Sequence, residues 1–282
     1  MKKVIDIRTQ PAKHWVGDGF PVRTLFSYHE GKELSPFLLL DYASPYYFAP
    51  SIEKRGVGQH PHRGFETVTI MYKGEVAHRD STGKSGIIGP GDIQWMTAGS
   101  GILHDEFHSE AFTQSGGEFE VVQLWINLPA HHKMTPPNYQ TLTNNNIPTV
   151  HLSNHQGYLR VIAGQFQEQH GPANTFTPMN IFDVNLKQDA TIPFTLPIGW
   201  TTIIVVLHGS ITINNDSTVT KEHIVLMDTI GQKLEVKANC DAAFLVLNGE
   251  PINEDVVGYG PFVMNTKQEI TQAIQDFNSG NF

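Results

Sequence analysis

Short runs of apolar residues, separated by glycine, proline, aspartate and asparagine, recur along almost the whole chain. Valine, isoleucine, threonine and phenylalanine dominate these runs, and such residues are favoured in β-strands. Runs of this length with turn residues between them are typical of an antiparallel sandwich or barrel. The pattern therefore predicts an all-β protein. The clearest runs are residues 65–72, 93–97, 119–128, 159–163, 202–207, 210–214, 223–227, 234–238 and 242–248.

One segment near the C-terminus follows a different period. Within residues 266–277 the apolar positions are spaced i, i+3, i+4 and i+7, as on one face of an amphipathic helix. We expect a short C-terminal α-helix here, packed on the second half of the protein. The apolar positions are Ile270, Ala273, Ile274 and Phe277.

The stretch 131–148 is the least favourable for regular structure. It contains two consecutive prolines and three consecutive asparagines, which are typical of a connection between structural units. The chain of 282 residues is long enough for about two domains. We therefore expect an N-terminal barrel over 1–132, a connecting segment over 133–148 and a C-terminal barrel over 149–282 that ends in the helix.

Charge and composition exclude several classes of protein. With 19 Lys and Arg against 28 Asp and Glu, the net charge is −9, which disfavours direct contact with nucleic acid. The single cysteine, Cys240, excludes an intrachain disulfide and a cysteine-cluster zinc site. Asp6 and Arg8 interrupt the apolar stretch that a secretion signal requires, and the apolar runs are far shorter than the ~20 residues of a membrane span. We expect a cytoplasmic protein that does not enter the membrane.

Histidine is concentrated in one part of the chain. Seven of the 14 histidines lie within residues 60–132, and three of these seven have a spacing that suits metal binding. We expect the other four to be ordinary. His78 is predicted to be an exposed or hydrogen-bonded strand residue and His108 a surface residue, while His131 and His132 fall in the connection.

Two pairs of residues spaced two apart carry the candidate metal chemistry. His60 and His62 flank Pro61, and on a strand both imidazoles point to the same face. Alone, this pair also fits solvated or capping histidines. His104 and Glu106 have the same spacing, so the two pairs offer three imidazole nitrogens and one carboxylate oxygen. This mixed set suits Fe, Mn, Ni, Co or Cu in an open octahedral site better than a closed zinc site. Two positions are then left for a bidentate substrate, or for substrate and dioxygen together.

The same residues lie in motifs that resemble a known family. Residues 60–68, His-Pro-His-Arg-Gly-Phe-Glu-Thr-Val, are similar to the first metal-binding motif of the pirin family in the cupin superfamily. Residues 91–104 resemble the second motif, and residues 123–129 resemble the strand that follows it. Residues 249–254 and 259–266 are similar to the C-terminal motifs of the family.

This resemblance implies a bicupin, that is, two cupin-type antiparallel β-barrels, with a metal ion in the N-terminal barrel alone. It also implies that His60, His62, His104 and Glu106 are the metal ligands and that iron is the first candidate for the metal. Pirin-like proteins of bacteria and animals are associated with quercetin 2,3-dioxygenase activity. The animal members are also associated with transcriptional co-regulation.

Glu66 is a second candidate carboxylate. Cupins often take a ligand from a glutamate four residues after the first histidine pair, and Glu66 shares the face of His60 and His62 if the chain does not bulge at Gly64. The pirin pattern uses Glu106 instead. Glu66 is then a nearby general base or a residue at the rim of the site.

The expected reaction is the ring opening of a flavonol such as quercetin by dioxygen, with the metal as Lewis acid and template. Glu106 or Glu66 is the candidate general base and thus the candidate catalytic residue. The expected cofactor is one divalent ion per chain, Fe(II) first, with Mn, Ni, Co, Cu or Zn as the others. The alternative is a non-enzymatic, redox-sensing metal protein that docks a protein partner as a transcription co-regulator, and a third reading is a purely structural metal. We expect a monomer whose partners are a small aromatic substrate and dioxygen.

Overall fold

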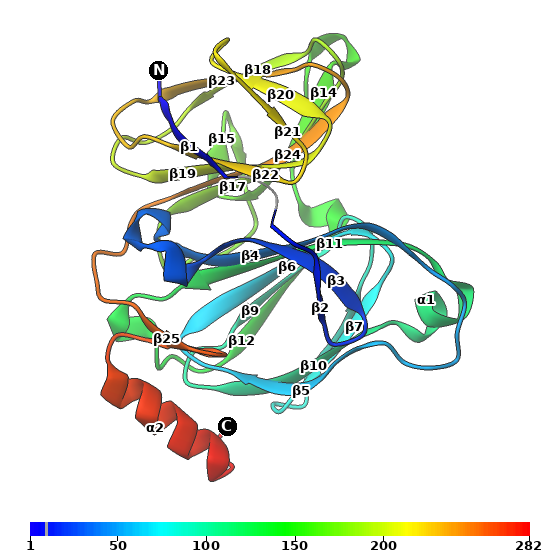
Figure 1. Ribbon diagram of the computed structural model, residues 1–282, viewed down its shortest axis with the longest axis vertical. Helices are drawn as coiled ribbons and strands as arrows, with labels where there is room; N and C mark the ends of the chain where they lie inside the picture. The colour runs from blue at the N-terminus through cyan, green and yellow to red at the C-terminus, as the bar shows by residue number, and fades with distance from the viewer. Residues whose placement is uncertain (9–10) are drawn as a thin grey trace. The chain divides into compact units, whose positions relative to one another are not determined.

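Strands make up most of the regular structure in the computed structural model, which describes residues 1–8 and 11–282 (Figure 1). The all-β prediction is confirmed, and a short α-helix ends the chain as expected. The two α-helices of the described residues are α1 (Glu110–Ser115) and α2 (Lys267–Asn278). Short 3-10 helices lie at Tyr28–Glu30, Lys32–Leu34, Ala130–His132, Asn144–Asn146 and Ser153–His155.

Two compact units form, and each contains both early and late parts of the sequence. The histidine unit consists of Ala12–Lys32, Phe37–Asn144 and Ile252–Phe282. The second unit consists of the described residues of Met1–Pro11 together with Glu33–Pro36 and Asn145–Pro251. The N-terminal strand pairs with a late strand of the second unit, while the C-terminal segment Ile252–Phe282 belongs to the histidine unit. The domain boundaries that we expected, 1–132, 133–148 and 149–282, remain a prediction. That prediction did not include the placement of the N-terminal strand in the second unit or of the C-terminal segment in the histidine unit.

The histidine unit is a sandwich of two sheets. A seven-stranded sheet has the order β12-β9-β6-β11-β4-β3-β2, and a four-stranded sheet has the order β5-β10-β7-β8. Apolar side chains from both sheets, such as Phe20, Val76 and Phe119, form one core. The strands are β2 (His14–Val16), β3 (Phe20–Ser27), β4 (Phe37–Phe48), β5 (Gly56–His62), β6 (Phe65–Lys73), β7 (Val76–Asp80), β8 (Ser85–Ile88), β9 (Ile93–Thr97), β10 (Ile102–His108), β11 (Gly117–Asn127) and β12 (Asn138–Leu142), with a hairpin of β25 (Val257–Tyr259) and β26 (Phe262–Met264).

The second unit repeats this plan. Its sheets have the orders β1-β22-β19-β24-β17-β14-β13 and β18-β23-β20-β21, with β15-β16 as a small hairpin. Phenylalanine rings fill the space between the sheets, and Phe182 and Phe194 stack with centroids 6.0 Å apart. The strands are β1 (Val4–Arg8), β13 (Thr149–His151), β14 (Gly157–Ala163), β15 (Gln165–Phe166), β16 (Gln169–His170), β17 (Met179–Leu186), β18 (Thr191–Thr195), β19 (Thr201–His208), β20 (Ser210–Ile213), β21 (Ser217–Thr220), β22 (His223–Met227), β23 (Lys233–Ala238) and β24 (Ala242–Gly249).

Both units are cupin domains, which confirms the predicted double-cupin architecture. Each is jelly-roll-like rather than a closed barrel, because the edge strands of its two large sheets do not hydrogen-bond to each other in the described part of the chain. The resulting sandwich leaves one end of the histidine unit free for a cavity between its sheets.

The C-terminal helix packs on a different unit from the one we expected. Helix α2 begins after Thr266, whose side chain and that of Glu269 form a capping box. Its apolar residues Ile270 and Ala273 pack on Phe262 and Met264 of the β25–β26 hairpin, beside which it lies in Figure 1. The β25–β26 hairpin and the helix both belong to the histidine unit, and the hairpin covers the apolar face of the helix.

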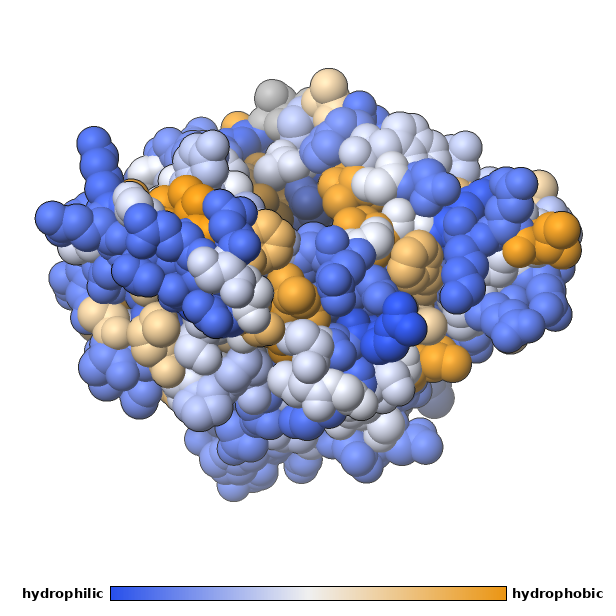
Figure 2. Space-filling view, turned by 90° about the horizontal axis from the view of Figure 1, so that it is seen from below, coloured by the Kyte–Doolittle hydropathy of each residue, from blue (hydrophilic) through white to orange (hydrophobic). Residues whose placement is uncertain are grey.

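The exposed apolar residues do not form one large patch on the face seen in Figure 2. Small groups of apolar side chains are separated there by polar ones. Scattered apolar residues of this kind are normal on a protein surface. Neither α-helix of the described chain is long and apolar enough to cross a bilayer.

Candidate metal centre

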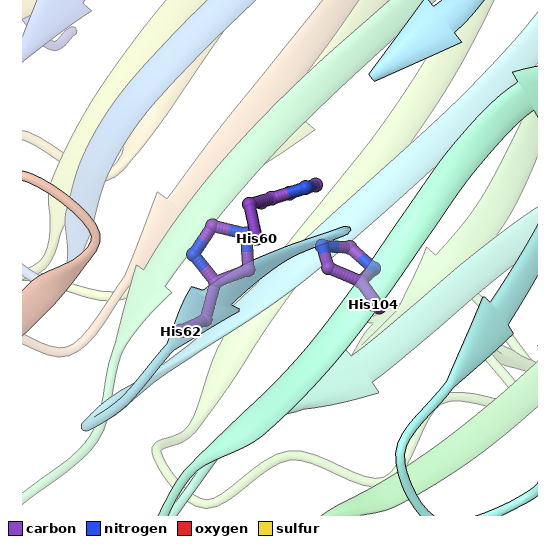
Figure 3. A group of neighbouring side chains, drawn as sticks. All are labelled: His60, His62 and His104. Atoms are coloured by element: carbon purple, nitrogen blue, oxygen red, sulfur yellow. The ribbon is translucent and has the colours of Figure 1, made fainter. Parts of the chain in front are cut away.

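Three histidines from two neighbouring strands converge in the histidine unit. His60 and His62 lie on β5, and His104 lies on β10 in register opposite His60. Because alternate residues of a strand point to the same face, all three rings project from one side of the four-stranded sheet. One donor atom from each ring lies within 4.8 Å of the others, and the rings surround a common point (Figure 3). The three histidines are therefore a candidate ligand set for one metal ion.

Burial keeps these imidazoles in the neutral form that binds metals. His62 is 4% and His104 is 1% exposed, and desolvation lowers the pKa of both well below the usual range. Neighbouring histidines lower the two pKa values further. His60 is less buried, and desolvation again lowers its pKa. Its Nδ1 donates to the carbonyl of Gly58 at 2.9 Å, which leaves Nε2 as the ligand atom.

Glu106 follows His104 on the same face of β10 and lines the same cavity as His60 and His62. It does not belong to the group of donor atoms that lie within 4.8 Å of one another. A bulge in β5 between the partners of His104 and Glu106 shifts the register at this point. Burial, with a smaller effect of the Asp105 charge, raises the pKa of Glu106 to about 7. Its Oε1 atom is buried without a hydrogen-bond partner among the described residues.

Glu66 lies on the opposite face of its sheet from the cavity. In register, Trp125 pairs with Thr67 and Ile126 pairs with Glu66. Since Trp125 lines the cavity, Glu66 points away from it. Its Oε1 accepts a hydrogen bond from Thr97 at 2.7 Å, and burial raises its pKa to about 7.

A turn at Gly64 explains why Glu66 does not share the face of the histidine pair. Gly64 has a φ of +89°, in the left-handed region that favours glycine. At this turn the chain leaves β5 in the four-stranded sheet and enters β6 in the seven-stranded sheet. The alternation of faces therefore does not continue from His62 to Glu66, and the condition under which we placed them together is not met.

The cavity beside the histidines has a volume of about 290 Å³. Most of its wall is apolar and includes Trp125, which lies edge-on to His62. Asp41 and Gln123 are polar wall residues that were not predicted as site residues. Each stands alone in an otherwise apolar strand segment, and this isolation was the signal that could have identified them. The lining residues are Val16, Phe20, Val22, Asp41, Val57, His60, His62, Glu106, Val121, Gln123, Trp125 and Pro261.

A larger hollow of about 650 Å³ lies on the other face of β10. It is lined by Asp105 and Phe107, which alternate along the strand with His104 and Glu106. The sheet itself therefore separates this hollow from His60, His62 and His104.

Two other histidines are more buried than expected. His78 pairs in register with Glu106 and stacks on Tyr139 with ring centroids 5.5 Å apart. His108, expected at the surface, is buried, and its Nε2 lies 2.9 Å from the carbonyl oxygen of Gly19. The expectation for His108 was wrong because strand β10 extends to this residue and turns its side chain into the aromatic core.

A buried lysine fixes the turn that follows His62. Lys133, 1% exposed, donates from Nζ to the carbonyls of Gly64 and Val263, both at 2.8 Å, and to the amide oxygen of Asn127 at 2.7 Å. Arg63 adds a bond to Asp276 of helix α2 at 2.7 Å. The C-terminal segment thus anchors the chain beside the histidine pair.

The donor set fits a first-row divalent metal ion. Nδ1 of His62 and both ring nitrogens of His104 are buried with no hydrogen-bond partner in the described chain, which is costly unless another group binds them. Neutral imidazoles with an adjacent carboxylate suit Fe, Mn, Co, Ni, Cu or Zn. The histidines therefore form a candidate site for a metal cofactor.

Two cupin domains, one of which carries a candidate metal site of three histidines, define a bicupin. The chain belongs to the pirin family. Residues 19–126 match the family model described as pirin, and residues 181–282 match the one described as the pirin C-terminal cupin domain.

Similar proteins come from several bacteria. A Pseudomonas aeruginosa protein provisionally named quercetin 2,3-dioxygenase is 55% identical over 100% of this chain and 99% of its own length. A solved structure of quercetin 2,3-dioxygenase from Acinetobacter baumannii is 52% identical, with a TM-score of 0.98 over 100% of this chain and 98% of its own. The Escherichia coli pirin YhhW, solved in complex with nickel(II), is 19% identical with a TM-score of 0.66 over 88% of this chain and 100% of its own. This last likeness concerns the fold alone.

Proposed function

We propose that this protein is a metal-dependent dioxygenase that opens the central ring of a flavonol such as quercetin. The observation that carries the proposal is the convergence of three imidazoles, two of them buried, beside a largely apolar cavity, with a carboxylate nearby. The names of the similar proteins from Pseudomonas and Acinetobacter support the same activity.

His60, His62 and His104 hold the metal ion in this proposal, and Glu106 is the fourth ligand. We propose iron(II) as the ion. When bound, it supplies Lewis acidity and the redox chemistry that dioxygen requires.

Glu106 is also the proposed general base. Its carboxylate accepts the proton of the flavonol hydroxyl group next to the ring carbonyl. The apolar wall, including Trp125 and Phe20, holds the flat rings and excludes water. Overall, both atoms of dioxygen enter the ring-opened ester, and one ring carbon leaves with its oxygen as carbon monoxide.

A turnover assay with iron-loaded protein tests the proposal. Oxygen uptake and carbon monoxide release are measured with quercetin for the wild type, for His60→Ala and for His155→Ala as an exposed-histidine control. We expect the His60 variant to lose activity by at least about 100-fold and the control to keep it. Equal rates with and without metal would overturn the proposal.

The same assay separates the proposal from its alternative. Iron binding at the three histidines without flavonol turnover would favour the redox-sensing regulator that docks a protein partner. We propose in addition that the enzyme acts in the cytoplasm as a monomer. Sedimentation of the metal-loaded protein tests the oligomeric state.

A further inference from the structure

Two polar side chains lie next to each other on the cavity wall formed by the seven-stranded sheet, whereas the histidines lie on the four-stranded sheet. Asp41 on β4 and Gln123 on β11 are paired in register, and both line the cavity. Trp125 follows Gln123 by two residues on the same face of β11 and contacts His62. Two residues of a strand span about 6.6 Å, so the polar pair lies about that far along the strand from the level of Trp125.

Each member of the pair is held by a threonine on a neighbouring strand. Thr24 donates from Oγ1 to Oδ1 of Asp41 at 2.6 Å, and Thr69 donates from Oγ1 to Oε1 of Gln123 at 2.7 Å. The other oxygen of Asp41 and the amide nitrogen of Gln123 have no hydrogen bond to the described residues. The cavity wall therefore presents a fixed acceptor beside a fixed donor.

We propose that Asp41 and Gln123 form a specificity subsite that binds a neutral hydroxyl group of the substrate at the cavity wall formed by the seven-stranded sheet, across from the sheet that carries the histidines. The inference rests on the proposed function and adds the class of substrate to it, a hydroxylated aromatic molecule without a charged outer ring. A phenolic hydroxyl donates to the carboxylate oxygen and accepts from the amide, so it satisfies both groups.

Other chemical groups at this position leave the subsite unsatisfied. A hydrogen atom in place of the hydroxyl leaves the donor and the acceptor without partners, which is costly in a buried site. A carboxylate is repelled by Asp41. An ammonium group pairs with Asp41 but offers no acceptor to the amide of Gln123. Burial raises the pKa of Asp41, in keeping with a side chain that is mostly shielded from water.

Binding measurements without oxygen test the subsite independently of catalysis. Calorimetry on the iron-loaded protein compares flavonols that share one core and carry a hydrogen, a hydroxyl, a carboxylate or an aminomethyl group on the outer ring. We expect the hydroxyl compound to bind about tenfold more tightly than the hydrogen compound, as two hydrogen bonds would give, and the carboxylate compound to bind more weakly than either. Tighter binding of the aminomethyl compound than of the hydroxyl compound would overturn the inference.

Two variants and a control assign the preference to the pair. In Asp41→Asn the oxygen can still accept from Thr24, while the second acceptor is lost. We expect the preference for hydroxyl to fall below about twofold and the rejection of the carboxylate to disappear. In Gln123→Met the hydroxyl preference should fall, while the carboxylate should still be rejected. Asp241→Asn, an exposed change in the second unit, should leave both ratios unchanged.

The outcomes distinguish the subsite from the activity. A wild-type hydroxyl preference that persists in both cavity variants overturns the subsite, as does a failure of all four compounds to bind. If the four compounds are discriminated as expected but none is consumed when oxygen is admitted, the subsite stands and the proposed dioxygenase function fails.

Discussion

The Nζ atom of Lys133 lies 2.8 Å from the carbonyl oxygen of Gly64, at the turn that joins the histidine strand β5 to β6. The lysine also binds Val263 of the C-terminal hairpin. It therefore connects the loop after β11, the turn after His62 and the end of the chain. Burial lowers the pKa of Lys133 to about 7, because desolvation penalises the charged form of its amino group.

Replacing Lys133 by methionine should destabilise the protein. The change leaves three buried acceptors without their donor, and each such loss costs on the order of 1 kcal/mol or more. We expect the free energy of unfolding to fall by about 3 kcal/mol, measured by urea denaturation. Lys267→Met, at an exposed position of helix α2, is the control and should change stability by less than about 0.5 kcal/mol. Equal stability of the two variants would contradict the role of Lys133.

Gly64→Ala should weaken both the fold and the metal site. The φ of +89° disfavours an L-residue, and a Cβ atom would lie 2.0 Å from the carbonyl oxygen of Val263. We expect a loss of at least about 2 kcal/mol in unfolding free energy, together with weaker metal binding by calorimetry. Gly83→Ala also has a positive φ but has open space around its Cβ position, so it separates the effect of the clash from that of the backbone. A Gly64 variant no less stable than the Gly83 variant would argue against the clash.

Glu106→Gln should lower metal affinity while the three histidines continue to bind. Loss of the carboxylate removes a negative charge and a ligand oxygen. We expect the dissociation constant for iron(II) or nickel(II) to rise about 10-fold to 100-fold. Glu66→Gln changes a carboxylate on the opposite face of the sheet and should change the affinity by less than about threefold. If both variants bind equally well, Glu106 is not a ligand.

The stability of the protein should fall as the pH rises from about 5 to about 7, in part because of Glu66. Its pKa of about 7 in the folded chain exceeds the value near 4.3 of an unfolded glutamate. In this pH range the folded state holds a proton that the unfolded state has released. The stabilisation is therefore present at low pH and lost through pH 7, and its size is on the order of 3 kcal/mol. Glu66→Gln should make the pH profile flatter in urea denaturation. A variant profile as steep as that of the wild type would contradict this account.

The local spacing of residues was enough to predict which members of the two pairs, His60 with His62 and His104 with Glu106, share a strand face. His60 and His62 share a face wherever they lie on a strand, and the same holds for His104 and Glu106. That His104 lies opposite His60 depends on the register of β10 against β5, which no local pattern determines. The family resemblance supplied this long-range information.

The face of Glu66 could not be predicted in the same way. Counting by twos from His62 assumes a continuous strand, whereas the chain changes sheets at Gly64. Both ends of helix α2 were predicted within one residue, but the unit on which we expected the helix to pack was wrong. Amphipathic spacing shows which face of a helix is buried but not which segment covers it.

The exchange of ends between the two units has a consequence for the order in which the protein is made. The histidines of β5 and β10 are synthesised well before Pro261, which lines their cavity, and Val263, which completes the bonding of Lys133. The cavity wall at Pro261 and the bonding of Lys133 can therefore be completed only after residues 252–282 have been synthesised.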